Sequence, residues 1–233
     1  PRRTTDMTDL LTPDEAQALF LSLRVSLVAV FAAMPFAAAA ALLLARTRFP
    51  GKIVVDGVIH LPLVLPPVAI GFLLLVLLGT RAGPGAWLYQ TFGIRFVFSW
   101  TGAALASALI TFPFQVRAIR LALESADPGL DAAAKTLGAG WFDRLVNLTL
   151  PLALPGIAAG LITAFAASLG EFGAIITFVS NIPGETRTLP LAIYSALQSP
   201  GGEAEAARLS LISIVLALVF MTLAEAAQRR MKR

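Results

Sequence analysis

The stretch "VSLVAVFAAMPFAAAAALLLA", residues 25–45, contains no charged side chain over 21 consecutive positions. A helix needs about 20 mainly apolar residues to cross the hydrocarbon core of a bilayer. The stretch therefore predicts a transmembrane helix over about residues 19–45, preceded by a polar tail over residues 1–18. The whole composition agrees with this prediction, because only 14% of the 233 residues are charged, against about 25% in soluble domains.

Four further apolar runs predict an all-α membrane protein with five transmembrane helices. A single transmembrane domain then covers residues 19–228. The run at 188–200 is interrupted by proline and is too short to cross, so we expect a re-entrant or interfacial segment there. The other four crossings are expected at about 54–80, 97–121, 151–179 and 207–227.

Lysine and arginine are distributed unequally between the two sides of this arrangement. The loops 46–52 and 117–144 and the basic tail 229–233 hold eleven of them, whereas the opposite side holds six. Cytoplasmic loops carry the excess of basic residues in membrane proteins. We therefore expect the N-terminus outside and the C-terminus in the cytoplasm. The basic residues then have a topological cause, and we expect no nucleic-acid partner.

Several kinds of site are excluded by the residue types that the chain contains. It has no cysteine and one histidine, so it offers no thiolate site and no multi-histidine metal site. It also lacks G-x-x-x-x-G-K-[ST], the loop that cradles the phosphates of ATP. We therefore expect no catalytic residue, no metal and no cofactor bound by this chain.

The segment "DAAAKTLGAGWFDRLVNLTLP", residues 131–151, carries charges and two glycines between two apolar runs. Asp127-Pro128 is typical of a helix start, and Gly138 stands where a left-handed C-cap favours glycine. The pattern predicts two short cytoplasmic helices over about 128–148. An amphipathic helix lying on the membrane is one interpretation. Docking into the groove of a soluble partner is the other, and two short helices with a fixed turn favour it.

The spacing in this segment resembles the cytoplasmic coupling signature of binding-protein-dependent ABC importer permeases. Two small residues, Ala133-Ala134, are followed by Gly138 and, after nine intervening residues, by L-x-L-P ending at Pro151. The signature usually begins with glutamate, where this chain has Ala132. The resemblance implies the type I ABC importer permease fold, with coupling helices in a cleft of the ATP-hydrolysing subunit. The residues implied in coupling are Asp131, Ala132, Ala133, Ala134, Leu137, Gly138, Trp141 and Phe142.

Three longer stretches narrow the resemblance to the molybdate permeases. They are "FPGKIVVDGVIHLPLVLPPVAIGFLLL" (49–75), "FPFQVRAIRLALESAD" (112–127) and "SLGEFGAIITFVSNIPGETRTLPLAIY" (168–194). The resemblance implies import of molybdate or tungstate across the bacterial inner membrane by alternating access. It also implies a periplasmic molybdate-binding protein and two cytoplasmic ABC ATPase subunits that bind ATP-Mg. A sulfate-type permease is the alternative, and an ion-driven secondary transporter is a further one.

Five crossings are few to enclose a pathway, so we expect two copies of the chain in the lipid bilayer, with the pathway on their two-fold axis. Glu171 is a carboxylate inside an apolar run, and such residues are functional candidates. A negative charge would repel an oxyanion, so we expect gating or helix pairing with a donor such as Arg187. Gly170 and Gly173 suit close helix approach there. The pathway needs only weak donors, although each candidate hydroxyl can instead bond its own helix. These candidates are Ser107, Thr111, Thr163, Ser168 and Thr177.

Overall fold

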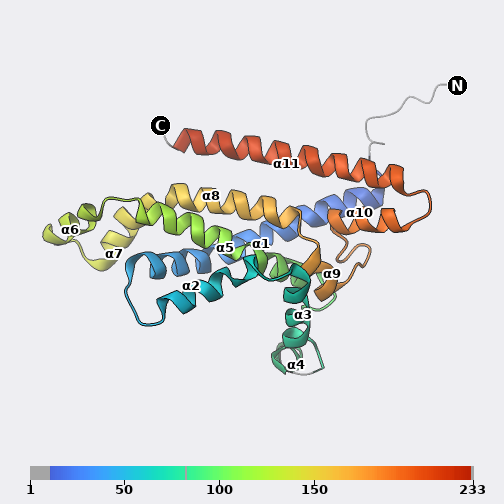
Figure 1. Ribbon diagram of the computed structural model, residues 1–233, viewed down its shortest axis with the longest axis horizontal. Helices are drawn as coiled ribbons and strands as arrows, with labels where there is room; N and C mark the ends of the chain where they lie inside the picture. Colours follow the sequence, from blue (N-terminus) through green and yellow to red (C-terminus); the bar gives the residue numbers. More distant parts are fainter. Residues whose placement is uncertain (1–10, 82, 232–233) are drawn as a thin grey trace.

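The computed structural model describes residues 11–81 and 83–231, and all regular structure in this part of the chain is helical. The long helices run side by side along one axis, as Figure 1 shows. The elements in chain order are α1 (Pro13–Arg46), α2 (Lys52–His60), the 3-10 turn η2 (Leu61–Leu63), α3 (Pro67–Leu78), α4 (Gly83–Phe92), α5 (Trp100–Glu124), α6 (Pro128–Thr136), α7 (Trp141–Arg144), the π-helical segment η3 (Leu145–Thr149), α8 (Leu150–Leu169), α9 (Gly173–Val179), α10 (Leu189–Gln198) and α11 (Glu203–Met231).

The centre of the bundle is α5, which packs against both α1 and α8. Small residues allow this close packing: a Cβ atom added at Gly160 of α8 would lie 3.0 Å from the Cα of Gln115 on α5. Two polar contacts fix α1 in the same core. The Gln115 side chain donates to the carbonyl of Val30 at 3.1 Å, and the Ser168 and Ser26 hydroxyls lie 3.0 Å apart.

Within residues 11–81 and 83–231, four helical stretches are long and apolar enough to cross a membrane: Pro13–Arg46, Trp100–Glu124, Trp141–Leu169 and Glu203–Thr222. The crossing expected at 54–80 is instead two helical pieces, Lys52–Leu63 and Pro67–Leu78, with a bend of 108° between them. The break falls at a cluster of prolines, which lack the N–H that would continue a helix. The expected count of five crossings is reached only when this bent pair is counted as one.

Two other expected boundaries are corrected by local hydrogen bonding. The tail expected over residues 1–18 becomes helical at Pro13, because Thr12 and Glu15 form a capping box. The backbone N–H of Thr12 donates to the Glu15 carboxylate at 2.7 Å. The helix that contains the crossing expected at 151–179 begins earlier, at Trp141, and ends at Leu169, before a three-residue break and α9. The expectations for residues 1–10, and for Lys232 and Arg233 of the basic tail, lie outside the described residues.

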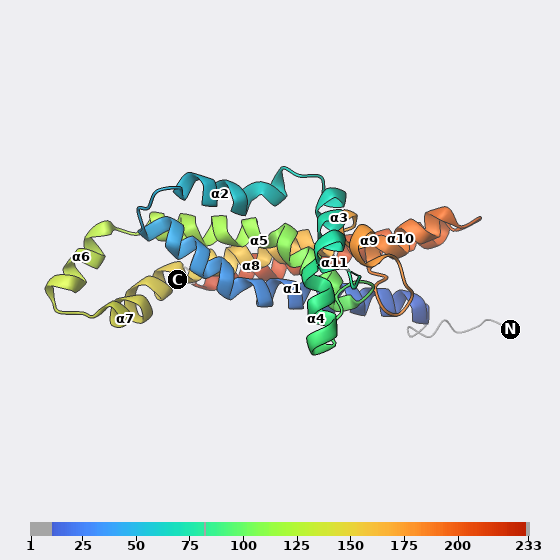
Figure 2. The same ribbon diagram turned by 90° about the horizontal axis from the view of Figure 1, so that it is seen from below.

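The end of the bundle at which α1 begins also holds α10 and the start of α11, whereas α6 and α7 lie at the opposite end (Figures 1 and 2). The ten-residue helix α10 falls in the segment expected at 188–200. Its first residue is anchored to α1, since the backbone N–H of Leu189 donates to the Ser22 hydroxyl at 2.6 Å. The start of α11 is held to α1 by an ion pair between Arg208 and Glu15, 2.6 Å apart.

Candidate functional site

The elbow, which we define as residues 127–149, projects beyond one end of the helix bundle (Figures 1 and 2). Its first helix, α6, starts where the Asp127 carboxylate accepts a hydrogen bond from the backbone N–H of Gly129 at 2.8 Å. It ends at a left-handed glycine, because Gly138 has a φ of +83°. The N–H groups of Gly138 and Ala139 donate to the carbonyls of Lys135 and Ala134, at 3.0 Å each. This pattern is a Schellman motif, so the predicted helix start and C-cap are confirmed.

Asp131 forms two ion pairs, one within α6 and one that joins α6 to α7. Its carboxylate lies 2.9 Å from the Lys135 ammonium, one turn along α6, and 3.1 Å from Nε of Arg144 in α7. The hydrogen bond from Lys135 lowers the pKa of Asp131, and the charges of Arg144 and Arg46 act in the same direction. A lowered carboxyl pKa stabilises the fold above the ordinary pKa of about 3.9 and stops doing so as the pH falls through the lowered value. The Asp131 carboxylate is therefore ionised, and its ion pairs with Lys135 and Arg144 are formed, at neutral pH.

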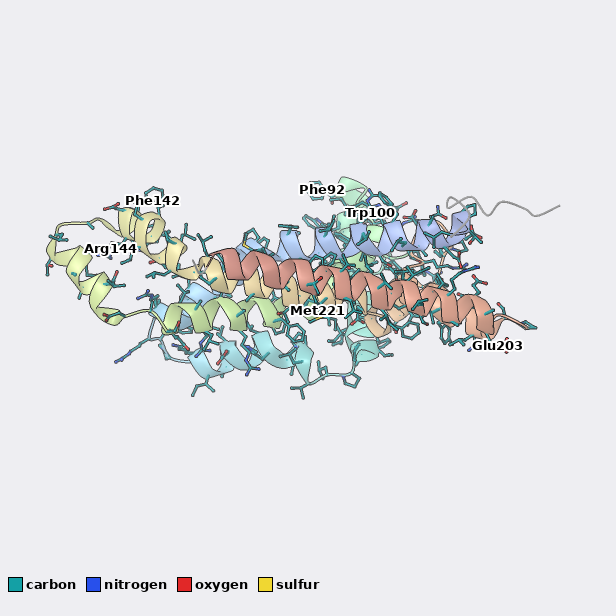
Figure 3. All side chains as sticks on the ribbon, turned by 90° about the horizontal axis from the view of Figure 1, so that it is seen from above. Phe92, Trp100, Phe142, Arg144, Glu203 and Met221 are labelled. Carbon is teal, nitrogen blue, oxygen red and sulfur yellow. The ribbon has the colours of Figure 1, made fainter. Side chains whose placement is uncertain are left out.

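The elbow exposes large apolar side chains. Leu137 is 86% exposed, Trp141 67% and Phe142 70%. Ala132 and Ala133 are exposed and Ala134 is half-buried, so the apolar stripe of α6 does not face the bundle. Figure 3 shows Phe142 at the outer side of the elbow, at the far end of the molecule from Glu203. Clustered apolar exposure of this kind marks a surface that binds a partner or a membrane.

Glu171 lies in the break between α8 and α9 and is only 7% exposed. Its carboxylate accepts a hydrogen bond from the backbone N–H of Ala174 at 2.8 Å, and so caps the start of α9. Arg187 instead donates to the side-chain oxygen of Asn181 at 3.0 Å. The expected pair of Glu171 with Arg187 is thus absent among the described residues, because unpaired N–H groups at a helix start lie closer to the carboxylate.

The two glycines that flank Glu171 differ in their surroundings. A Cβ atom at Gly173 would lie 2.9 Å from the Cβ of Pro67, so the first turns of α9 and α3 approach closely there. At Gly170 the nearest described atom would be the carbonyl oxygen of Ala167, 3.8 Å away. Among the described residues of this single chain, close helix approach requires Gly173 but not Gly170, whose role stays a prediction.

Most of the hydroxyl residues expected in the pathway are buried in the bundle or hydrogen-bonded within their own helix. Thr111, Thr163 and Thr177 each donate to a carbonyl one turn earlier in their own helix, at 2.8–2.9 Å. Ser107 and Ser168 are buried, and the Ser107 hydroxyl has no hydrogen-bond partner among the described residues. Thr163 is the exposed member of the set. The pathway assignment stays a prediction, and geometry favours Thr163.

Sequence reasoning missed two ion pairs that join residues far apart in the chain. Arg208 pairs with the buried Glu15, and Arg120 pairs with Asp56 at 2.9 Å while also bonding Glu124 at 2.7 Å. The Arg120–Glu124 spacing is a visible helical i,i+4 signal. The pairs between helices have no such signal, because their partners are 193 and 64 residues apart.

The sequence profile of one family, described as "Binding-protein-dependent transport system inner membrane component", matches residues 27–233. The chain belongs to this family. This inner membrane component is 58% identical over 216 residues to the "Molybdenum transport system permease protein ModB" of Escherichia coli strain K12, covering 93% of the chain and 94% of the relative. It is 54% identical over 219 residues to the protein of the same name in Haemophilus influenzae, covering 94% and 96%.

The fold of this inner membrane component is also found among solved structures. A bacterial alginate ABC transporter, solved in complex with an alginate-bound periplasmic protein, matches with a TM-score of 0.78 at 20% identity. The match covers 97% of this chain and 82% of that one. Likeness at this identity concerns the fold alone. This likeness confirms the prediction that the chain is an all-α, multi-pass membrane protein with the fold of a type I ABC importer permease.

Proposed function

We propose that this chain is the membrane-spanning permease subunit of an ATP-driven molybdate importer in the bacterial inner membrane. The observation that carries the proposal is the 58% identity to the Escherichia coli molybdenum permease over 93% of the chain. A sulfate-type permease is not favoured, because two molybdenum permeases match at 54–58% identity over nearly their whole length. Tungstate remains the second oxyanion of this proposal.

The elbow is the proposed contact with a separate ATPase subunit. Its capped turn at Gly138 and its ion pairs at Asp131 make it a rigid unit, and its exposed apolar side chains require a partner. The coupling set of the elbow comprises Asp131 to Ala134, Leu137, Gly138, Trp141 and Phe142. Because α7, η3 and α8 form one continuous helix, movement of the docked elbow would be transmitted directly to the bundle.

The transport cycle follows from this arrangement. Two copies of the chain would enclose the pathway, with the elbow and the C-terminus in the cytoplasm and the N-terminus outside. ATP-Mg bound by two ATPase subunits would drive the elbows, and the bundle would open outward to receive the oxyanion from a periplasmic binding protein. Hydrolysis would reverse the movement. Glu171, as the cap of α9 next to the close contact at Gly173, is the proposed gating residue.

Uptake measurements test the substrate. Cells that lack their own molybdate permease should regain uptake of radiolabelled molybdate when this chain is produced with its ATPase and binding protein. A hundredfold excess of sulfate should change the rate less than twofold, whereas unlabelled tungstate should compete. Strong competition by sulfate would instead identify a sulfate-type permease, and uptake that persists without the ATPase would identify a secondary transporter.

Cysteine labelling tests the orientation, and the absence of native cysteine makes it direct. Trp141→Cys on the elbow should react with a membrane-impermeant maleimide only in inside-out vesicles made without the ATPase. Ser199→Cys, exposed between α10 and α11 at the opposite end, should react in intact cells. Labelling of Trp141→Cys in intact cells would contradict the orientation and the docking role together.

A further inference from the structure

A cavity of about 690 Å³ lies between the last turns of α1 and the elbow. This volume is within the range of roughly 300–1,000 Å³ that is usual for small-molecule sites. The walls come from α1, α6, α7 and η3, so elements separated by more than 80 residues meet around it. The cavity therefore lies where the bundle meets the elbow.

The wall that α1 provides changes from apolar to cationic along the helix. Ala39, Leu42, Leu43 and Arg46 line the cavity, and their spacing of i, i+3, i+4 and i+7 places them on one helix face. At 1.5 Å per residue this face extends about 10 Å. Its apolar part lies toward the middle of the bundle, and its guanidinium lies at the end of α1 beside the elbow.

The elbow side of the cavity is also cationic. Lys135 and Arg144 join Arg46 in its lining, and Asp131 is the single carboxylate that lines it among the side chains that the structure describes. Asp131 is shared between Lys135 and Arg144, whereas Arg46 has no carboxylate within salt-bridge distance among the described residues. The Nε of Arg144 is buried and has no aligned hydrogen-bond acceptor among them. Three cations with one shared carboxylate leave positive charge available for an anionic ligand.

We propose that this cavity binds an anionic phospholipid, with the phosphate against Arg46, Lys135 and Arg144 and an acyl chain along Leu42 and Leu43. The change from apolar to cationic side chains along α1 matches the change from acyl chain to headgroup in a phospholipid whose headgroup faces the elbow. Basic pockets between membrane helices on the cytoplasmic side bind anionic headgroups, and the assignment to that leaflet rests on the orientation proposed above. A free oxyanion would use the charges but not the apolar wall.

Native mass spectrometry of the purified chain, titrated with phosphatidylglycerol or phosphatidylcholine, tests the site without any transport assay. Phosphatidylglycerol should bind more tightly, and Arg46→Gln should weaken its binding about fivefold. The Arg46, Lys135 and Arg144 triple glutamine variant should weaken it on the order of 100-fold. Arg48→Gln is the matched control, because Arg48 is exposed two residues beyond Arg46 and does not line the cavity. Equal binding by Arg46→Gln and Arg48→Gln would overturn the proposal.

A second comparison separates a lipid from a free anion. Leu43→Ser should weaken phosphatidylglycerol binding at least threefold, whereas Leu27→Ser, at a residue of α1 with the same 44% exposure but outside the cavity, should not. Glycerophosphoglycerol, the headgroup without acyl chains, should compete poorly. If glycerophosphoglycerol or orthophosphate bound as tightly as the intact lipid, the cavity would be a plain oxyanion site and the lipid proposal would be wrong. These binding measurements do not involve transport, so their outcome is independent of the outcome of the molybdate uptake test.

Discussion

Replacing Gly138 with valine should lower ATP-driven molybdate uptake at least tenfold while the chain still inserts and folds. Gly138 has a φ of +83°, and a Cβ added there would meet no described atom within 4 Å. The effect would therefore arise from the backbone, since a left-handed conformation costs an L-residue about 1–2 kcal/mol and a β-branched residue rarely adopts it. The two hydrogen bonds of the Schellman motif would be lost, and α7 would change its direction relative to α6. Initial uptake rates and the ATPase activity of the assembled transporter measure the result.

Two control variants make this prediction specific to the elbow. Gly138→Asn should keep most of the uptake, because asparagine tolerates the left-handed region. Gly93→Val introduces the same kind of strain after α4, where φ is +68° and no described atom would lie within 4 Å of the new Cβ. It should leave uptake nearly unchanged. Normal uptake and ATPase stimulation in Gly138→Val would show that coupling does not depend on this turn, and equal loss in Gly93→Val would indicate general misfolding.

The local geometry of the elbow could be predicted from sequence because each signal acts within a few residues. Asp127 caps the helix that starts beside it, and Gly138 ends that helix. The ion pair of Asp131 with Arg144 and the cavity lined by Arg46 could not be predicted in the same way. They depend on how α1 and the elbow pack together, and no short-range rule gives that packing.

The broken crossing shows a second limit of sequence reasoning. Hydropathy gives residues 54–80 as one apolar run, because it carries no information about the direction of the helix axis. The prolines indicate where the run bends, but the angle of 108° belongs to the packing of α3 on α9. A Cβ atom at Gly71 of α3 would lie 2.6 Å from the carbonyl oxygen of Ala174 in α9. The hydrogen bond by which Glu171 caps α9 could not be predicted for a related reason, because the apolar run hid the start of α9.

Gly156→Val should destabilise the bundle more than any surface change. Gly156 lies on α8, and a Cβ atom there would lie 2.6 Å from both the carbonyl oxygen of Ala118 and the Cβ of Ala122, on α5. Because the backbone of α5 is one of these neighbours, α5 and α8 would have to move apart. Such overpacking costs about 1–3 kcal/mol, which corresponds to a fall of roughly 2–12 °C in Tm for a chain of this size. Thermal unfolding of the detergent-solubilised chain measures the shift.

Gly57→Val is the matched control for this variant, because Gly57 is also inside a helix but has no described atom within 4 Å of an added Cβ. It makes the same change in side-chain volume and helix propensity without the contact, so its Tm should stay within a few degrees of the parent. Gly156→Ala should fall between the two, since it adds only the Cβ. Transport should decrease in the same order, because α8 continues through η3 into α7 and a displaced α8 moves the elbow. If Gly156→Val and Gly57→Val had equal Tm, the contact between α5 and α8 would not hold the bundle together.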